Sequence, residues 1–199
     1  SPLVPKAIFG IANAYFKQGV FAQAIRNYQQ VVEKFPNQKV PIHEAGAEPI
    51  EDLRPEAQYF NAESYLNLQK YTQAIRAYEQ VIQHYPKSDW ADDAQYGIAV
   101  AYEHLGQKEK SIQAYQTLMQ KYSDRELAPA VQLQIARFYY QDKDYKRALA
   151  EFQKGINQYP NTPSAWLSQY NIGKCYVALE SYRQAIQAFE RVNPKSEYA

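Results

Sequence analysis

The segment "KYTQAIRAYEQVIQHYP", residues 70–86, decides the fold. Its apolar residues recur three and four positions apart, which is the spacing that puts side chains on one face of an α-helix. Pro86 ends the helix, because proline cannot continue the hydrogen-bond ladder and disfavours helical geometry in the residue before it. The apolar face consists of Tyr71, Ala74, Ile75, Tyr78, Val81, Ile82 and Tyr85.

Similar text occurs three more times, as "VFAQAIRNYQQVVEKFP" at 20–36, "DYKRALAEFQKGINQYP" at 144–160 and "SYRQAIQAFE" at 181–190. The small residue of the core motif gives an anchor for aligning the copies. Anchors 74, 111, 148 and 185 are each 37 residues apart, whereas the first step, from 24, is 50. Regular spacing of this size predicts stacked structural repeats. The anchors are Ala24, Ala74, Ser111, Ala148 and Ala185.

Further columns keep the same register. A small residue stands twelve positions before each anchor, a tyrosine nine before it and an aromatic ring four after it. Small residues let two helix axes approach closely, and large rings fill the space beside them. The columns are Ala12, Ala62, Ala99, Ala136 and Gly173; Tyr15, Tyr65, Tyr102, Tyr139 and Tyr176; and Tyr28, Tyr78, Tyr115, Phe152 and Phe189.

Each repeat therefore predicts two antiparallel helices, A and B, joined by a turn of breakers or polar residues. The expected fold class is all-α, with ten helices. We expect them at about 4–17, 21–35, 54–68, 71–85, 90–105, 108–122, 127–141, 145–159, 164–179 and 182–192. They form five repeats, at about 4–36, 54–86, 90–123, 127–160 and 164–194, in one array over residues 1–199.

These columns resemble the tetratricopeptide repeat (TPR), in the pair of small residues, the tyrosine between them and the closing proline. Two features depart from that motif. The period is 37, against about 34 for the family. The large residue expected early in helix A is Ile8 in the first repeat, but Gln58, Gln95, Gln132 and Gln169 afterwards. The resemblance implies a right-handed α-solenoid that binds a protein partner and carries no cofactor.

The closing "YPxS" and the restart "xxAxxAQY" are similar to long repeats of bacterial cell-envelope TPR proteins, such as Tol–Pal-associated coordinators and BamD-type outer-membrane assembly lipoproteins. This resemblance alone favours the periplasm or cell envelope, and localisation is otherwise open. The stretch "NPKSEYA" at 193–199 echoes "YPKSDWA" at 85–91, where a helix A begins. We therefore expect the chain to be a fragment of a longer array.

Composition excludes several classes of partner. The formal net charge is +1, so nucleic acid and anionic membranes are not expected as main partners. No apolar run approaches the roughly 20 residues needed to span a bilayer. Of the 19 tyrosines, 17 belong to repeat columns, which favours packing over a stacking surface for sugars or bases.

No catalytic or metal-binding constellation is predicted. His43, His84 and His104 do not pair with cysteine or carboxylate residues at metal-ligand spacing, and the sequence holds no phosphate-binding glycine loop or HExxH motif. Cys175, the single cysteine, lies in a packing column, which predicts a buried, unreactive thiol. Asp92-Asp93 begins a helix, where negative charge interacts favourably with the helix dipole.

The TPR resemblance implies that the A helices line a concave groove. The residues fifteen and eleven positions before each anchor, together with their neighbours eight before it, project into that groove. An aromatic row flanked by polar residues suits a peptide or helix laid along it; the alternative is that the row only packs between neighbouring A helices. The candidate groove residues are Phe9, Asn13, Tyr59, Glu63, Tyr96, Glu103, Leu133, Arg137, Tyr140, Tyr170 and Lys174.

The insertion at 37–53 breaks the period and is rich in acids and prolines. It is either a solvated loop or a loop that contacts a partner, since insertions in solenoids often bind. Three functions follow from the sequence. The first is a non-enzymatic scaffold that binds a peptide or helix in the groove, and the second is a module that self-associates through truncated repeat ends. The third is the non-catalytic arm of a larger enzyme or complex.

Overall fold

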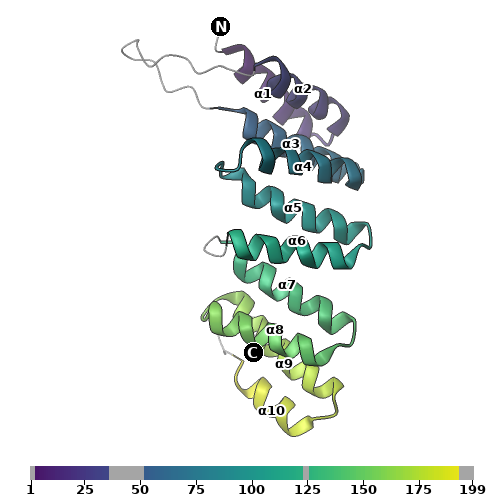
Figure 1. Ribbon diagram of the computed structural model, residues 1–199, viewed down its shortest axis with the longest axis vertical. Coiled ribbons are helices and arrows are strands. Elements are labelled where there is room, and N and C mark those ends of the chain that lie inside the picture. The colour runs from purple at the N-terminus through teal and green to yellow at the C-terminus, as the bar shows by residue number, and fades with distance from the viewer. Residues whose placement is uncertain (1–2, 36–51, 123–125, 193–199) are drawn as a thin grey trace, which may run out of the picture. The chain divides into compact units, whose positions relative to one another are not determined.

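The computed structural model describes residues 3–35, 52–122 and 126–192, and in them it has ten α-helices and no strand (Figure 1). The predicted fold class is confirmed, and the helix ends differ from the prediction by one or two residues. Most of the predicted 37–53 loop and the echo at 193–199 lie outside the described residues. The helices are α1 (Leu3–Lys17), α2 (Phe21–Lys34), α3 (Arg54–Asn67), α4 (Tyr71–His84), α5 (Trp90–His104), α6 (Lys108–Lys121), α7 (Ala128–Gln141), α8 (Tyr145–Gln158), α9 (Pro163–Ala178) and α10 (Tyr182–Glu190).

Odd-numbered helices are the A helices and even-numbered ones the B helices. The chain forms two compact units, Ser1–Ala114 and Tyr115–Ala199, whose boundary falls within α6. In the first unit α1 to α5 pack in succession, and α3 also contacts α5. In the second unit α7 to α10 pack in succession, and α7 also contacts α9. Each helix of the pairs α3/α5 and α7/α9 thus contacts both a B helix and the other A helix of its pair.

The prolines that follow the B helices explain where those helices end. Phe35, Tyr85 and Tyr159 each precede a proline in the sequence, and their φ angles are −123°, −132° and −128°. Their ψ angles of 51°, 50° and 56° take these residues out of the helical region, which a following proline disfavours in the residue before it. The helical hydrogen-bond ladder therefore stops at Lys34, His84 and Gln158.

The turn from A to B has the same geometry in every repeat. One residue in each turn has a positive φ, a conformation that glycine adopts without strain and that other residues adopt at a cost of roughly 1–2 kcal/mol. The tyrosine nine positions before the anchor accepts a backbone hydrogen bond from the residue five further on, at 2.9–3.0 Å, which closes the helix end. The turn residues are Gly19, Gln69, Gly106, Lys143 and Glu180.

The small and aromatic columns form the core, as the sequence predicts. The anchor and its partner twelve residues earlier are almost completely buried in every repeat, and Tyr28, Tyr78 and Phe152 are fully buried. The close approach of helices is tightest at two glycines. A Cβ added to Gly97 would lie 2.4 Å from the Tyr78 ring, and one added to Gly173 would lie 2.4 Å from the Phe189 ring.

The glutamine column, which departs from the TPR pattern, links the two helices of four of the five repeats. The side-chain Nε2 of each glutamine donates a hydrogen bond to the backbone carbonyl oxygen nineteen residues later, on the B helix. Because a buried amide is costly without partners, this bond explains how the column tolerates a polar residue. The pairs are Gln58–Ala77 (3.0 Å), Gln95–Ala114 (3.0 Å), Gln132–Glu151 (3.0 Å) and Gln169–Ala188 (2.8 Å).

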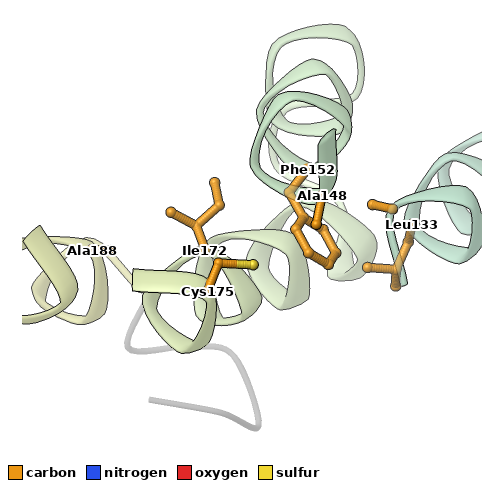
Figure 2. Close-up of a cluster of buried hydrophobic side chains, with 7 residues drawn as sticks. Leu133, Ala148, Phe152, Ile172, Cys175 and Ala188 are labelled. Carbon is orange, nitrogen blue, oxygen red and sulfur yellow. The ribbon is translucent and has the colours of Figure 1, made fainter. Parts of the chain in front are cut away.

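In the second unit one apolar cluster joins α7, α8, α9 and α10. Figure 2 shows the ring of Phe152 between Leu133 of α7 and the Ile172 and Cys175 side chains of α9. Phe152 is fully buried, so its ring supplies much of the apolar area that this cluster removes from water. Because Leu133 lies in this cluster, the cluster also fixes the position of α7, which carries part of the candidate site.

Candidate functional site

The candidate groove residues lie on the A helices, and the structure divides them into buried and surface side chains. In the first unit Phe9 is only 9% exposed, and its ring centroid lies 5.8 Å from that of Tyr28. In the second unit Leu133 is 7% exposed. These two side chains pack in the cores of their units and offer little surface to a partner. The other nine candidates are half-buried or exposed.

Asn13 and Glu63 hold the hydroxyl groups of core tyrosines. The Tyr28 hydroxyl donates to Asn13 Oδ1 at 2.6 Å, and the Tyr78 hydroxyl donates to Glu63 Oε1. Burial first, and then the Glu63 charge and hydrogen bond, raise the pKa of the Tyr78 phenol far above its ordinary value. The sequence pattern did not reveal that these polar residues also satisfy buried hydroxyl groups.

An aromatic cluster occupies the α3–α5 face of the first unit. The Tyr59 and Trp90 rings stack with their centroids 4.8 Å apart, and the Phe60 ring lies 5.4 Å from each of them. Burial, followed by the charges of Glu63 and Asp93, raises the pKa of the Tyr59 phenol. The sequence analysis missed Trp90 and Phe60, although the tryptophan at the start of a helix A was a usable signal.

Tyr96 and Glu103 complete the candidates of the first unit, both on α5. Tyr96 is half-buried and lies close enough to Tyr59 to contribute to the raised pKa of that phenol. Glu103 is exposed and lies in the last turn of the helix. The structure therefore brings Tyr59, Glu63 and Tyr96 together and leaves Glu103 farther along α5.

In the second unit α7 and α9 bring three candidates together. The Lys174 ammonium lies 5.0 Å from the Tyr140 ring centroid and 6.0 Å from the Tyr170 ring centroid. All three side chains are half-buried. A cation within about 6 Å of a ring is attracted by the negative face of its π-system. We call Tyr140, Tyr170 and Lys174 the cation–tyrosine cluster.

The B helices support this cluster from behind. The Tyr140 ring packs edge-on against Tyr145 of α8 at 5.6 Å, and the Tyr170 ring packs against Phe189 of α10 at 5.6 Å. Burial, with smaller contributions from neighbouring titratable groups, raises the pKa of the Tyr140 phenol. Arg137, one helical turn before Tyr140, is half-buried and adds a second positive charge to α7.

The remaining residues considered for chemistry, Cys175, Asp92 and Asp93, lie where the sequence predicts a structural role. Cys175 is completely buried, as predicted, and burial raises the pKa of its thiol to about 11. Asp92 and Asp93 lie in the first turn of α5, as expected. Across the described residues, no group of three or more histidine, cysteine or carboxylate side chains is placed to hold a metal ion. No helix within those ranges is long and apolar enough to cross a bilayer.

Comparison with family models supports the repeat assignment. Two tetratricopeptide-repeat models match residues 6–37 and 61–126, and a model described as anaphase-promoting complex, cyclosome, subunit 3 matches residues 118–192. The chain has the tetratricopeptide-repeat fold. No curated protein sequence matches it significantly. The Tol–Pal and BamD-type resemblance finds no support among these matches.

Solved TPR-like structures match over nearly the whole chain. A crystal structure of the MamA protein aligns with a TM-score of 0.66 at 18% identity, covering 96% of this chain and 91% of that one. Repeats of a putative kinesin light chain from Podosopora anserina align with a TM-score of 0.62 at 20% identity, covering 96% and 94%. YrrB, described as a TPR protein with an unusual peptide-binding site, aligns at 0.59 and 15% identity, covering 96% and 87%. These identities show a shared TPR fold alone.

Proposed function

We propose that this TPR chain is a non-enzymatic scaffold that binds a peptide or helix of a protein partner on those candidate groove residues of its A helices that are not buried. The cation–tyrosine cluster on α7 and α9 carries this proposal. Its three side chains are only half-buried, and none of them is among the buried residues of the second unit's core, although Tyr140 packs against that core. The peptide-binding site named for YrrB shows that a TPR protein can serve this kind of partner.

The cluster indicates the chemistry of the partner segment. Lys174 and the nearby Arg137 favour a carboxylate, which each can meet with a charge-assisted hydrogen bond. The rings of Tyr140 and Tyr170 offer rigid apolar surface with hydroxyl groups at the rim, the combination that is enriched where binding energy concentrates. We therefore expect a segment that carries an acidic residue next to an aromatic or aliphatic side chain.

The direct test is selection from a displayed peptide library with the parent chain and two charge-reversal variants. Lys174→Glu changes the cluster, and Lys146→Glu changes an exposed lysine on the B helix α8 as a matched control. Circular dichroism establishes first that all three proteins are equally folded. We expect enrichment of acidic-apolar peptides, at least tenfold weaker binding to Lys174→Glu and unchanged binding to Lys146→Glu. Equal binding to all three proteins, or no enrichment by the parent, would overturn the proposal.

The envelope setting is a further part of the proposal, and it rests on the resemblance of the repeat pattern. Fractionation of the native host tests it with an antibody against the chain. Recovery with periplasmic and outer-membrane markers supports the setting. Recovery with cytosolic markers alone contradicts it and leaves the groove proposal unaffected.

A second candidate function is self-association through the outer face of α10. Tyr182 is 61% exposed and Ile186 is 59% exposed, whereas Ile25 and Ile75, which occupy the column of Ile186, are 8% and 6% exposed. Apolar side chains of this size are normally covered in a repeat array. Light scattering tests this candidate: the mass should rise with concentration, and the rise should disappear in Ile186→Glu. A concentration-independent monomer mass would contradict it.

A further inference from the structure

A cleft of about 260 Å³ opens on the B-helix side of the first unit, where the last turns of α2 and α4 face the second turn of α3. It is separate from the candidate groove, because none of the candidate groove residues lines it. Polar side chains from three helices form most of its wall. The polar lining consists of Gln29 and Glu33 of α2, Gln58 and Asn61 of α3, and Gln80 and His84 of α4.

Asn61 is the unusual residue of this cleft. It is 4% exposed, and its Oδ1 atom has no hydrogen-bond partner in the part of the chain that the structure describes. Asn61 stands thirteen positions before its anchor. The same column holds isoleucine in the four other repeats, at Ile11, Ile98, Ile135 and Ile172.

Packing does not explain the exception. An isoleucine would bury more apolar surface than asparagine and would leave no polar atom unsatisfied. A residue that departs from the packing pattern of its column and lowers stability is typical of a functional site. The unpartnered amide oxygen at the wall of a cleft therefore points to a ligand that donates a hydrogen bond to it.

The hydrogen bonds of the other amides define what the cleft offers. Gln58 Nε2 donates to Gln80 Oε1 at 2.9 Å and to the Ala77 carbonyl at 3.0 Å, which uses both of its N–H groups. Gln29 Nε2 donates to the Tyr65 hydroxyl at 3.4 Å. The cleft thus presents the second lone pair of Gln80 Oε1 and the Glu33 carboxylate, and the Asn61 oxygen lies buried in its wall.

Charge and size select among possible ligands. Glu33 is the acidic group of the lining, and no lysine or arginine is among the described residues that form it. With His84 counted as neutral, the lining carries one negative charge, so the cleft favours a cation. Acceptors placed on three helices suit the guanidinium group, whose five N–H donors spread in a plane, better than the compact ammonium. The volume lies below the roughly 300–1,000 Å³ of small-molecule sites and fits a single long side chain.

We propose that this cleft binds a guanidinium group, supplied either by an arginine side chain of a protein partner or by a free guanidino compound. The Glu33 carboxylate holds the charge, and Asn61 Oδ1 accepts a hydrogen bond at the wall. This site is independent of the groove proposed above, since the two lie on different helix faces.

Nuclear magnetic resonance of the ¹⁵N-labelled chain tests the proposal, with the side-chain amide signals of Asn61, Gln58 and Gln80 as the readout. The probes are N-acetyl-arginine amide and its neutral isostere, N-acetyl-citrulline amide. We expect saturable shifts with the arginine probe and at least tenfold weaker binding of the citrulline probe. Equal shifts with both probes, or shifts spread over all surface carboxylates without saturation, would overturn the proposal.

Two variants sharpen this test. Asn61→Ile restores the isoleucine of the column, so we expect it to raise the unfolding midpoint and to abolish binding of the arginine probe. Glu33→Gln changes an exposed residue and should weaken binding at least tenfold, whereas Glu109→Gln, also exposed in the same unit, should leave it unchanged. Binding that survives Asn61→Ile and Glu33→Gln would contradict the assignment, even if one of the variants folded poorly.

The two sources of the guanidinium group are distinguished by a peptide that carries one arginine within a glycine-rich sequence. Tighter binding of the peptide than of the amide probe identifies a protein segment as the ligand. Weaker binding of the peptide identifies a free guanidino compound. If neither probe binds, the cleft is not a guanidinium site.

Discussion

At the scale of single residues, the ring four positions after the anchor and the residue eleven positions before it are matched in four of the five repeats, and the third repeat, with Tyr115 and Val100, is the exception. Repeats with Tyr28 or Tyr78 four residues after the anchor carry Asn13 or Glu63, both hydrogen-bond acceptors, eleven residues before it. Repeats with Phe152 or Phe189 instead carry the donors Arg137 and Lys174. A phenylalanine ring has no hydroxyl group that needs a hydrogen-bond partner, so Arg137 and Lys174 are not required as partners of a core ring.

This pairing can be read from the sequence only when the column four positions after the anchor is compared with the column eleven positions before it. The positions of the small and aromatic residues could be predicted because packing depends on size at a fixed spacing. The roles of Asn13 and Glu63 could not be predicted in this way. A polar residue in this column can either face solvent or accept a hydrogen bond from a buried hydroxyl group, and its type does not distinguish the two. The buried positions of Phe9 and Leu133 depend on how closely neighbouring helices approach, which the spacing alone does not give.

Gly97 tests the close approach of α4 and α5. We expect Gly97→Ala to lower the free energy of unfolding by about 1–3 kcal/mol, since its Cβ would lie 2.4 Å from the buried Tyr78 ring. Gly10 occupies the same column in the first repeat and has no atom within 4 Å of an added Cβ. Gly10→Ala should therefore raise stability by up to about 1 kcal/mol through helix propensity. Urea denaturation measures both, and equal effects of the two substitutions would contradict this packing.

Cys175 tests whether the core of the second unit excludes water. Burial raises the pKa of its thiol to about 11, so the native state favours the neutral form. The raised pKa adds to the free energy of unfolding at pH values below the ordinary thiol pKa. This contribution is lost as the pH rises towards 11. We expect labelling by a disulfide reagent at pH ~8 to be at least ~100-fold slower in the native than in the urea-unfolded chain. Rapid native labelling at that pH would show an accessible thiolate.

At the scale of helices, the glutamine bridges join A to B in four of the five repeats. The sequence places glutamine where a TPR carries a large apolar residue, and its periodic recurrence indicates a structural role. The particular partner, a backbone carbonyl of the B helix, could not be predicted, because spacing along the chain does not give which carbonyl of the facing helix lies within reach of the side chain. The helix ends, in contrast, were predicted within one or two residues, since proline and turn residues act locally.

Gln95 tests the contribution of one bridge. Gln95→Ala removes a buried hydrogen bond of 3.0 Å and leaves a small cavity between α5 and α6. We expect the free energy of unfolding to fall by roughly 2 kcal/mol. Gln73→Ala, at an exposed position of α4, should change it by less than about 0.5 kcal/mol. A similar, small effect of both substitutions in chemical denaturation would show that the bridge contributes little.

At the scale of the whole molecule, the chain is nearly neutral, but the candidate groove residues of its two units carry charge of opposite sign. Glu63 and Glu103 of the first unit are acidic, whereas Arg137 and Lys174 of the second unit are basic. The formal net charge of +1 conceals this difference between the two units. The number of repeats and their helices were predictable from periodicity, whereas the identity of the partner does not follow from the repeat columns.

The most direct measurement is photo-crosslinking in the native host from two positions of the second unit. Val177, on the A helix α9, is 46% exposed, and Ile186, on the B helix α10, is 59% exposed. A photoreactive residue at position 177 should form a covalent adduct with a partner protein, and that adduct should be lost when Lys174→Glu is added. Adducts formed only from position 186, and only with a second copy of the chain, would contradict binding on the A helices and identify self-association instead.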